Sequence, residues 1–122
     1  MLNWLKSSFH TPRPLEFYAD DIAAGRVYVN VMFERLFQNS MPSGHTQTAF
    51  TVATVLLWAY KRAGKLTFWN GCFVCALACA VGLSRVYVGA HFPVDVLAGA
   101  GLGVVTALPS CWIIAYYLKG RD

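Results

Sequence analysis

The stretch Ser84-Arg85-Val86-Tyr87-Val88-Gly89-Ala90-His91-Phe92-Pro93-Val94-Asp95 lies between two long apolar runs and decides how the chain folds. It places a cation, an imidazole and a carboxylate where a membrane helix would begin, and such groups are costly inside lipid unless they serve a function. Proline suits the first turn of a helix, because its missing N–H would be unpaired there in any case. We therefore expect a helix to begin between His91 and Pro93, with functional groups at its start.

His91 and Asp95 are four residues apart, so a helix that included both would place them on one face. A carboxylate in that position can accept a hydrogen bond from one ring nitrogen and fix the tautomer of the imidazole. The other ring nitrogen would then be available to attack an electrophile. The spacing predicts a nucleophilic histidine with a carboxylate that orients it.

The composition indicates a membrane protein. Of the 122 residues, 57% are hydrophobic and 13% are charged, whereas about 25% charged residues is usual in soluble domains. Two runs without Lys, Arg, Asp or Glu cover 19 residues (66–84) and 23 residues (96–118), and about 20 apolar residues cross the hydrocarbon core of a bilayer. A third run, Thr46–Tyr60, has 15 residues, a length that a buried core helix can also have.

We therefore expect a single all-α domain over residues 1–122, an integral-membrane helix bundle with about three transmembrane helices and an N-terminal interfacial helix. The expected membrane helices cover residues 43–61, 66–88 and 93–118.

The basic residues orient these helices. The loop 61–65 carries three of them and residues 119–121 carry two more, and three spans place both groups on one side of the membrane. The positive-inside rule makes that side cytoplasmic. His45 and the 85–95 loop then share the non-cytoplasmic side. The net charge of +4 does not indicate nucleic-acid binding, because the basic residues do not form one stripe with interleaved aromatic residues.

Residues 15–39 have apolar positions at roughly helical spacing, with polar residues between them. The segment is too polar to cross a bilayer, so we expect an amphipathic helix at the membrane surface. A helix there could act as a lid beside the site, or it could simply pack against the bundle.

The segment Ser40-Met41-Pro42-Ser43-Gly44-His45 opens the first apolar helix. Backbone N–H groups in the first turn of a helix have no intrahelical partner and lie at the positive end of the helix dipole, which favours an anion. Gly44 lets an oxyanion approach the backbone, Ser43 adds a hydroxyl, and His45 can exchange a proton near neutral pH. An N-cap followed by an incidental histidine would give the same residues, so this segment alone leaves both interpretations open.

Three segments together resemble the three-part signature of the type 2 phosphatidic acid phosphatase superfamily: Lys6 to Arg13-Pro14, Pro42-Ser43-Gly44-His45, and Ser84-Arg85 with His91 and Asp95. The first and second are separated by 27 residues, and the second and third by 38. The resemblance implies that residues 1–40 hold a phosphate-binding segment and the surface helix. Family members that act on membrane lipids typically have six spans, so the chain looks like their catalytic C-terminal half.

The resemblance also implies a role for each motif residue. Five residues would bind phosphate through positive charge or hydrogen-bond donors: Lys6, Arg13, Ser43, Gly44 and Arg85. His91 would attack phosphorus to give a phosphohistidine, oriented by Asp95, and His45 would protonate the leaving oxygen and then activate water. No metal or other cofactor is expected, because cationic side chains would do the work that Mg²⁺ does in kinases.

We expect a membrane phosphatase that hydrolyses a lipid phosphate or an isoprenoid diphosphate, located in the inner membrane of a bacterium with its site on the non-cytoplasmic side. Two alternatives stay open. The superfamily also includes vanadate-dependent haloperoxidases and soluble acid phosphatases, although the apolar spans argue against both. The same motifs would also be present in a non-enzymatic membrane interaction protein or an inactive short family member, and an oligomer is compatible with each of these interpretations.

Overall fold

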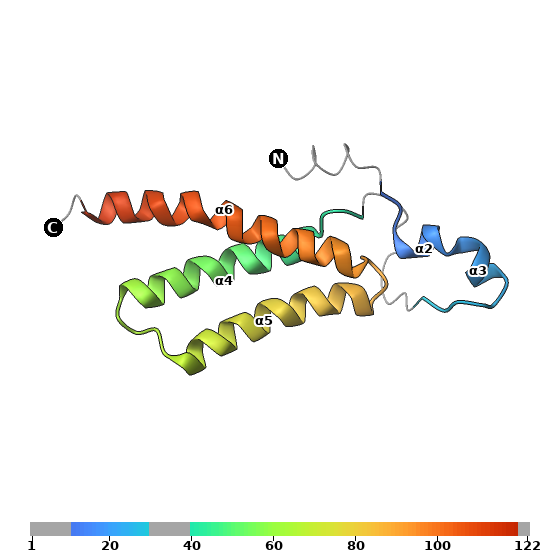
Figure 1. Cartoon of the computed structure of the whole chain (residues 1–122), viewed down its shortest axis with the longest axis horizontal. Coiled ribbons are helices and arrows are strands. Elements are labelled where there is room, and N and C mark those ends of the chain that lie inside the picture. Colours follow the sequence, from blue (N-terminus) through green and yellow to red (C-terminus); the bar gives the residue numbers. More distant parts are fainter. Residues whose placement is uncertain (1–10, 30–39, 120–122) are drawn as a thin grey trace.

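The computed structural model describes residues 11–29 and 40–119, which form five helices and no strand. The helices are α2 (Pro14–Phe17), α3 (Ala19–Ala23), α4 (Gly44–Arg62), α5 (Phe68–Tyr87) and α6 (Pro93–Lys119). The three long helices lie side by side with alternating directions, and α2 and α3 lie beyond the end of the bundle where α4 and α6 begin (Figure 1). The described part of the chain is therefore all-α, as the sequence predicts.

The three long helices begin and end within two residues of the ranges expected from the sequence. Local signals explain this agreement. Thr67 and Asn70 form a capping box at the start of α5, in which each side chain accepts a hydrogen bond from the backbone N–H of the other (2.9 and 3.3 Å). Pro93 is the first residue of α6, the position at which proline is favoured.

A Schellman motif centred on Gly89 ends α5 and reverses the chain. Gly89 has a φ of 66°, a conformation that L-residues with a Cβ rarely adopt. The Ala90 N–H donates to the Arg85 carbonyl (3.1 Å), and the Gly89 N–H donates to the Val86 carbonyl (3.0 Å). The same motif ends α4 at Gly64. The turn at Gly89 fixes where the residues that follow it lie relative to the end of α5.

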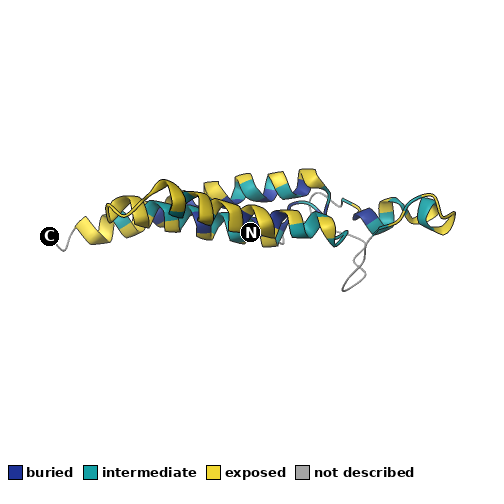
Figure 2. Cartoon of the chain, turned by 90° about the horizontal axis from the view of Figure 1, so that it is seen from below, coloured by how far each residue is buried: buried dark blue, intermediate teal, exposed yellow. Residues whose placement is uncertain are grey.

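Two of the described helices, α5 and α6, are long and apolar enough to cross a membrane. Most of their residues are exposed, in contrast to the core helices of soluble proteins (Figure 2). The third expected span, α4, falls short because it is more polar. Its threonines bond within the helix: the hydroxyls of Thr48, Thr51 and Thr54 donate to the carbonyl groups four residues before them (2.8–3.0 Å). These side chains lower the hydropathy of α4 while their own hydroxyls are satisfied.

The continuous surface helix expected over residues 15–39 is wrong in its described part. The chain there forms two short helices that are interrupted at Tyr18 and end at Ala23, and residues 27–29 are not helical. Gly25 terminates α3 with a φ of 70°, while the N–H of Arg26 donates to the carbonyl of Asp21 (2.8 Å). Apolar periodicity alone does not predict where such a glycine turn ends a helix. Residues 30–39 lie outside the described residues.

Two glycines bring α6 into backbone contact with α4. A Cβ added to Gly99 would lie 2.5 Å from the Ser43 carbonyl oxygen, and one added to Gly103 would lie 2.5 Å from that of Gln47. The Gly103 carbonyl also accepts a hydrogen bond from the Thr51 hydroxyl (3.0 Å). Small residues allow such approach where packing, rather than burial from water, holds helices together. This glycine pair packs within the chain and holds the start of α4 against the start of α6.

Candidate active site

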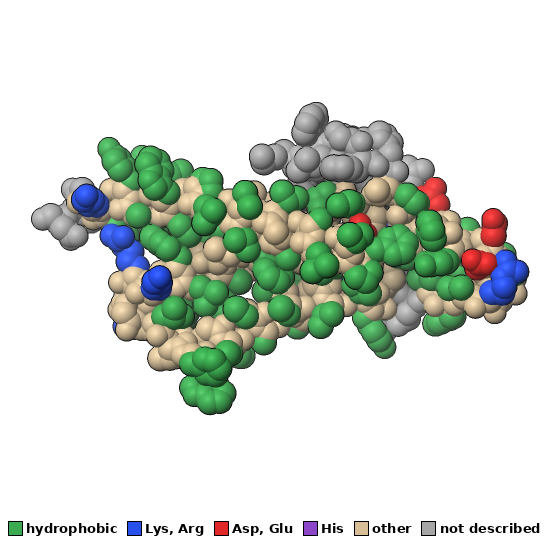
Figure 3. All heavy atoms as spheres, in the orientation of Figure 1, with side chains coloured by type: hydrophobic (Ala, Val, Ile, Leu, Met, Phe, Trp, Pro, Cys, Tyr) green, Lys and Arg blue, Asp and Glu red, His purple; other side chains and the backbone are tan. Residues whose placement is uncertain are grey.

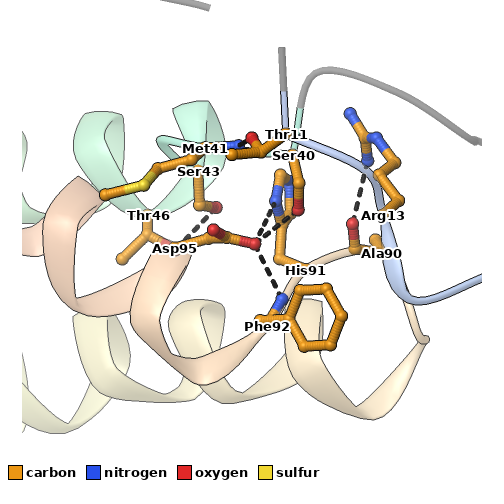
Figure 4. Close-up of polar contacts among 10 residues, drawn as sticks. All are labelled: Thr11, Arg13, Ser40, Met41, Ser43, Thr46, Ala90, His91, Phe92 and Asp95. Carbon is orange, nitrogen blue, oxygen red and sulfur yellow. Dashed lines mark hydrogen bonds and ion pairs between the residues drawn. The ribbon is translucent and has the colours of Figure 1, made fainter. Parts of the chain in front are cut away.

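Residues from the three motif segments meet at one end of the bundle (Figure 4). The guanidinium of Arg13 donates from Nη1 to the carbonyl oxygen of Ala90 (3.0 Å), across 77 positions of the sequence. The backbone N–H of Ser43 donates to the carbonyl oxygen of Asp95 (3.0 Å). Each contact joins one segment to the loop and helix start that contain His91, so the three segments form one structural unit.

His91 and Asp95 are both buried, with 4% and 3% of their surface exposed. The distance from His91 Nδ1 to Asp95 Oδ2 is 3.8 Å, which is longer than a hydrogen bond. The sequence predicts a direct hydrogen bond, but α6 begins at Pro93, so His91 precedes the helix and the geometry of residues four apart on a helix does not apply. The ring thus lies within ion-pair distance of Asp95, and the backbone N–H of His91 donates to the carbonyl of Arg85 (3.2 Å).

Ser40 holds the carboxylate of Asp95, and the sequence analysis assigned no role to it. Its hydroxyl donates to Asp95 Oδ2, the oxygen that also accepts the backbone N–H of Phe92 (2.8 Å). Ser40 is fully buried, and its own N–H donates to the carbonyl of Thr11 (3.1 Å). Phe92 directly precedes α6 and Asp95 is the third residue of the helix, so the second contact is half of a capping box. No sequence pattern marks Ser40, because its partner lies 55 residues away.

Arg13 is buried with 7% of its surface exposed. Burial lowers the pKa of Arg13, and the negative charge of the Asp95 carboxylate opposes this shift. An arginine remains charged in proteins even so, because its ordinary pKa lies far above neutrality. Pro14, the first residue of α2, fixes the backbone just beyond Arg13, which is extended. The site therefore contains a buried cation close to a buried carboxylate.

The remaining predicted site residues lie around this centre. Ser43 is buried at the N-cap of α4, where its hydroxyl accepts a hydrogen bond from that of Thr46 (2.9 Å). Gly44 and His45 are the first two residues of α4, and His45 is exposed. Arg85 lies in the last turn of α5 and is partly buried. Lys6 lies outside the described residues.

Within the described ranges, no group of three or more His, Cys, Asp or Glu side chains has the arrangement of a metal site. The functional groups that the described residues place at or next to this centre are those of Arg13, Arg85, His45, His91 and Asp95, together with backbone N–H groups. Such a set is suited to binding an anion with several oxygens and to transferring a group between a histidine and water.

The chain is similar to several proteins of known name. The bacitracin transport permease protein BcrC of Bacillus licheniformis is 42% identical over 84 residues, which are 69% of this chain and 38% of that protein. Lipid A 1-phosphatase of Porphyromonas gingivalis is 37% identical over 75 residues, 62% of this chain and 16% of that protein. The putative undecaprenyl-diphosphatase YbjG of Escherichia coli is 34% identical over 70 residues, 57% and 32% of the two chains. The chain thus spans less than half the length of these relatives.

The fold is similar to that of a solved structure. The crystal structure of Aquifex aeolicus LpxE matches with a TM-score of 0.65 and 34% sequence identity, over 95% of this chain and 58% of LpxE. The family model described as the PAP2 superfamily matches residues 1–119, which include all three motif segments. On this evidence the chain belongs to the PAP2 superfamily.

Proposed function

We propose that this chain is an integral-membrane phosphatase that removes phosphate from a lipid phosphate or an isoprenoid diphosphate. The observation that carries the proposal is the convergence of Arg13, His91 and Asp95, which are buried together where α4 and α6 begin. Two relatives are named for removing phosphate from lipid A and from undecaprenyl diphosphate. The apolar helices α5 and α6 would place the site at the membrane, where such substrates reside.

Positive charge and backbone donors would bind the phosphate. Arg13 and Arg85 present planar guanidinium groups that suit two-pronged contacts with phosphate oxygens, and Lys6 would add a third cation. The first turn of α4 would direct its N–H groups at the same anion, with Gly44 allowing close approach and Ser43 supplying a hydroxyl. Together they would neutralise the charge that otherwise repels a nucleophile from phosphorus.

The two histidines would divide the chemistry. An imidazole nitrogen of His91 would form a bond to phosphorus while the bond from phosphorus to the lipid oxygen breaks, and His45 would give its proton to that oxygen. His45, now neutral, would take a proton from water as the water attacks the phosphohistidine, which releases inorganic phosphate and restores both residues. Asp95 would stabilise the positive charge on His91 and hold its orientation. The exposure of His45 fits contact with a leaving group and with water.

The charges support an orientation with the site on the non-cytoplasmic side. Lys and Arg side chains gather at the end of the bundle formed by the α4–α5 loop and the end of α6, and Asp and Glu gather at the opposite end (Figure 3). The basic residue Arg26 also lies at the acidic end, where its guanidinium forms an ion pair with the carboxylate of Asp21 (2.7 Å). If α4, α5 and α6 all span the membrane, the positive-inside rule makes the basic end cytoplasmic. In a bacterium this membrane would be the inner one.

The test is phosphate release by the chain purified in detergent, with phosphatidic acid, phosphatidylglycerophosphate and undecaprenyl diphosphate as substrates. We expect release that persists in EDTA, is inhibited by vanadate and is lost in His91→Ala. His45→Ala should still be phosphorylated by an activated aryl phosphate, because a good leaving group needs no acid, but should lose turnover of lipid phosphates. A folded protein without turnover of any substrate would overturn the proposal in favour of a non-enzymatic role.

A further inference from the structure

An apolar groove runs along the bundle between α4 and α5. It encloses about 280 Å³ and is lined by residues 48–56 of α4 and 74–81 of α5. Alanines form part of its lining, and two of them, Ala53 and Ala78, are buried. Larger residues line the groove as well, among them Val52 and Leu77, which are 52% and 54% exposed. The groove exists because small side chains at the helix contact leave a hollow between larger ones.

The groove begins next to the proposed leaving-group acid. His45 lies three and four residues before Thr48 and Ala49, and seven before Val52, so all four share one face of α4. On α5, Arg85 follows Val81 by four residues and continues the row that lines the other wall.

The two ends meet because α4 and α5 run in opposite directions. A Cβ added to Gly82 would lie 3.5 Å from the side chain of Thr46, so the second-last turn of α5 lies beside the first turn of α4. The groove thus has a histidine and an arginine at its mouth, and almost only hydrocarbon beyond them.

We propose that this groove binds the hydrocarbon chain of the substrate, with the phosphate at the mouth; the inference rests on the proposed function. An anionic headgroup complements the cationic residues at the mouth, and an alkyl or isoprenoid chain complements the apolar walls. The oxygen that His45 protonates belongs to the leaving group, so the leaving group must lie on the face of α4 that carries His45. That face is the wall of the groove. From Thr48 to Leu56 it extends about 12 Å, enough for the first part of a lipid chain.

The groove should therefore make turnover depend on chain length. For short-chain substrates that are present in water as monomers, each methylene that moves from water into an apolar site changes affinity by about fourfold. With detergent-purified protein, kcat/KM should rise along a series of short-chain to longer phosphatidic acids and level off once the chain exceeds the groove. The water-soluble substrate p-nitrophenyl phosphate, which has no such chain, reports on the phosphate site alone.

A matched pair of variants tests the location. Leu77→Trp fills the groove, and Leu83→Trp places the same residue at an exposed position of α5 outside it, where Leu83 is 68% exposed. We expect Leu77→Trp to lower the ratio of kcat/KM for a water-soluble short-chain phosphatidic acid to that for p-nitrophenyl phosphate by about 15-fold, the effect of excluding about two methylenes. Leu83→Trp should keep the wild-type ratio. If Leu77→Trp fails to fold, Val52→Trp on the opposite wall replaces it, with Val105→Trp on α6 as its control.

The outcomes separate the two proposals. Equal ratios in Leu77→Trp and Leu83→Trp would overturn the groove assignment and indicate that another element, such as a further helix of a longer protein, covers this face. Turnover of p-nitrophenyl phosphate without dependence on lipid chain length would overturn it as well, and would leave the phosphatase proposal standing. Failure of the folded wild-type protein to turn over either substrate would overturn both.

Discussion

Replacing Ser40 by alanine should slow catalysis although Ser40 is not expected to touch the substrate. The hydroxyl of Ser40 donates a hydrogen bond to Asp95 Oδ2. The same oxygen accepts a hydrogen bond from the backbone N–H of Phe92 and lies 3.8 Å from His91 Nδ1. A hydrogen bond to a charged group contributes about 1.5–3 kcal/mol to stability. Because Ser40 is fully buried, no bulk water takes the place of its hydroxyl.

The loss of this bond would act on kcat more than on KM. A carboxylate with one fewer donor would adopt several orientations, and His91 would lose part of the field that stabilises its positive charge during attack. If about half to all of 1.5–3 kcal/mol is lost in the transition state, kcat falls about 4- to 160-fold. Arg13, whose bond to Ala90 does not involve Ser40, would still bind phosphate, so KM should stay within about twofold.

The assay compares steady-state kinetics and thermal unfolding of Ser40→Ala with those of Thr51→Val. Thr51 is a matched control, because its hydroxyl bonds to the Gly103 carbonyl (3.0 Å) and to the Thr106 hydroxyl (3.1 Å) between α4 and α6, two turns from the N-cap of α4. Both variants should unfold at lower temperature, but only Ser40→Ala should lose kcat. The reasoning is refuted if kcat follows the unfolding temperature equally in both variants, or if Ser40→Ala keeps the wild-type kcat.

Two further predictions use glycines in matched pairs. Gly89→Ala and Gly64→Ala each force a Cβ into a positive-φ position (66° and 65°), so each should lower the free energy of unfolding by about 1–2 kcal/mol in denaturant titrations. Phosphate release should fall only in Gly89→Ala, because Gly89 sets the position of the following site residues; equal activity losses would contradict this. Gly99→Ala places a Cβ 2.5 Å from a carbonyl oxygen of α4 and should reduce turnover of lipid and soluble substrates alike. In Gly101→Ala, where no described atom beyond the neighbouring residues of α6 lies within 4 Å of the added Cβ, turnover should be unchanged, and a loss there would refute the contact argument.

The positions of the long helices could be predicted because their signals are local. Uncharged runs set their approximate lengths, Pro93 marks the start of α6, and basic residues occupy the last turn of α4. The three motif segments could likewise be recognised from the sequence as parts of one phosphatase signature. Their meeting in space, which the contacts of Arg13 with Ala90 and of Ser43 with Asp95 now describe, was an expectation that rested on the family resemblance.

What the sequence could not predict depends on the tertiary structure. Ser40 contacts a partner 55 residues away, and a serine before Met-Pro has no pattern that distinguishes it from an ordinary turn residue. The hydrogen bond expected between His91 and Asp95 assumed that one helix contains both, an assumption that fails because α6 starts two residues after His91. A difference of two residues at a helix end hardly alters the helix itself, but here it leaves the two side chains at an ion-pair distance of 3.8 Å in place of a hydrogen bond.

The site is assembled mainly through backbone groups. The carbonyls of Ala90, Asp95 and Arg85 accept the bonds that place Arg13, the start of α4 and the backbone of His91. The approach of Gly99 to α4 is a backbone contact as well. A site built in this way tolerates many changes of side chain on the exposed faces of α5 and α6, because those side chains hold none of its parts. We expect it not to tolerate a shift of α6 along α4, since such a shift would separate the Ser43 N–H from the Asp95 carbonyl and move the proposed anion-binding turn away from the proposed nucleophile. We therefore expect the glycines at this contact to be as important for the proposed catalysis as the charged residues that they bring together.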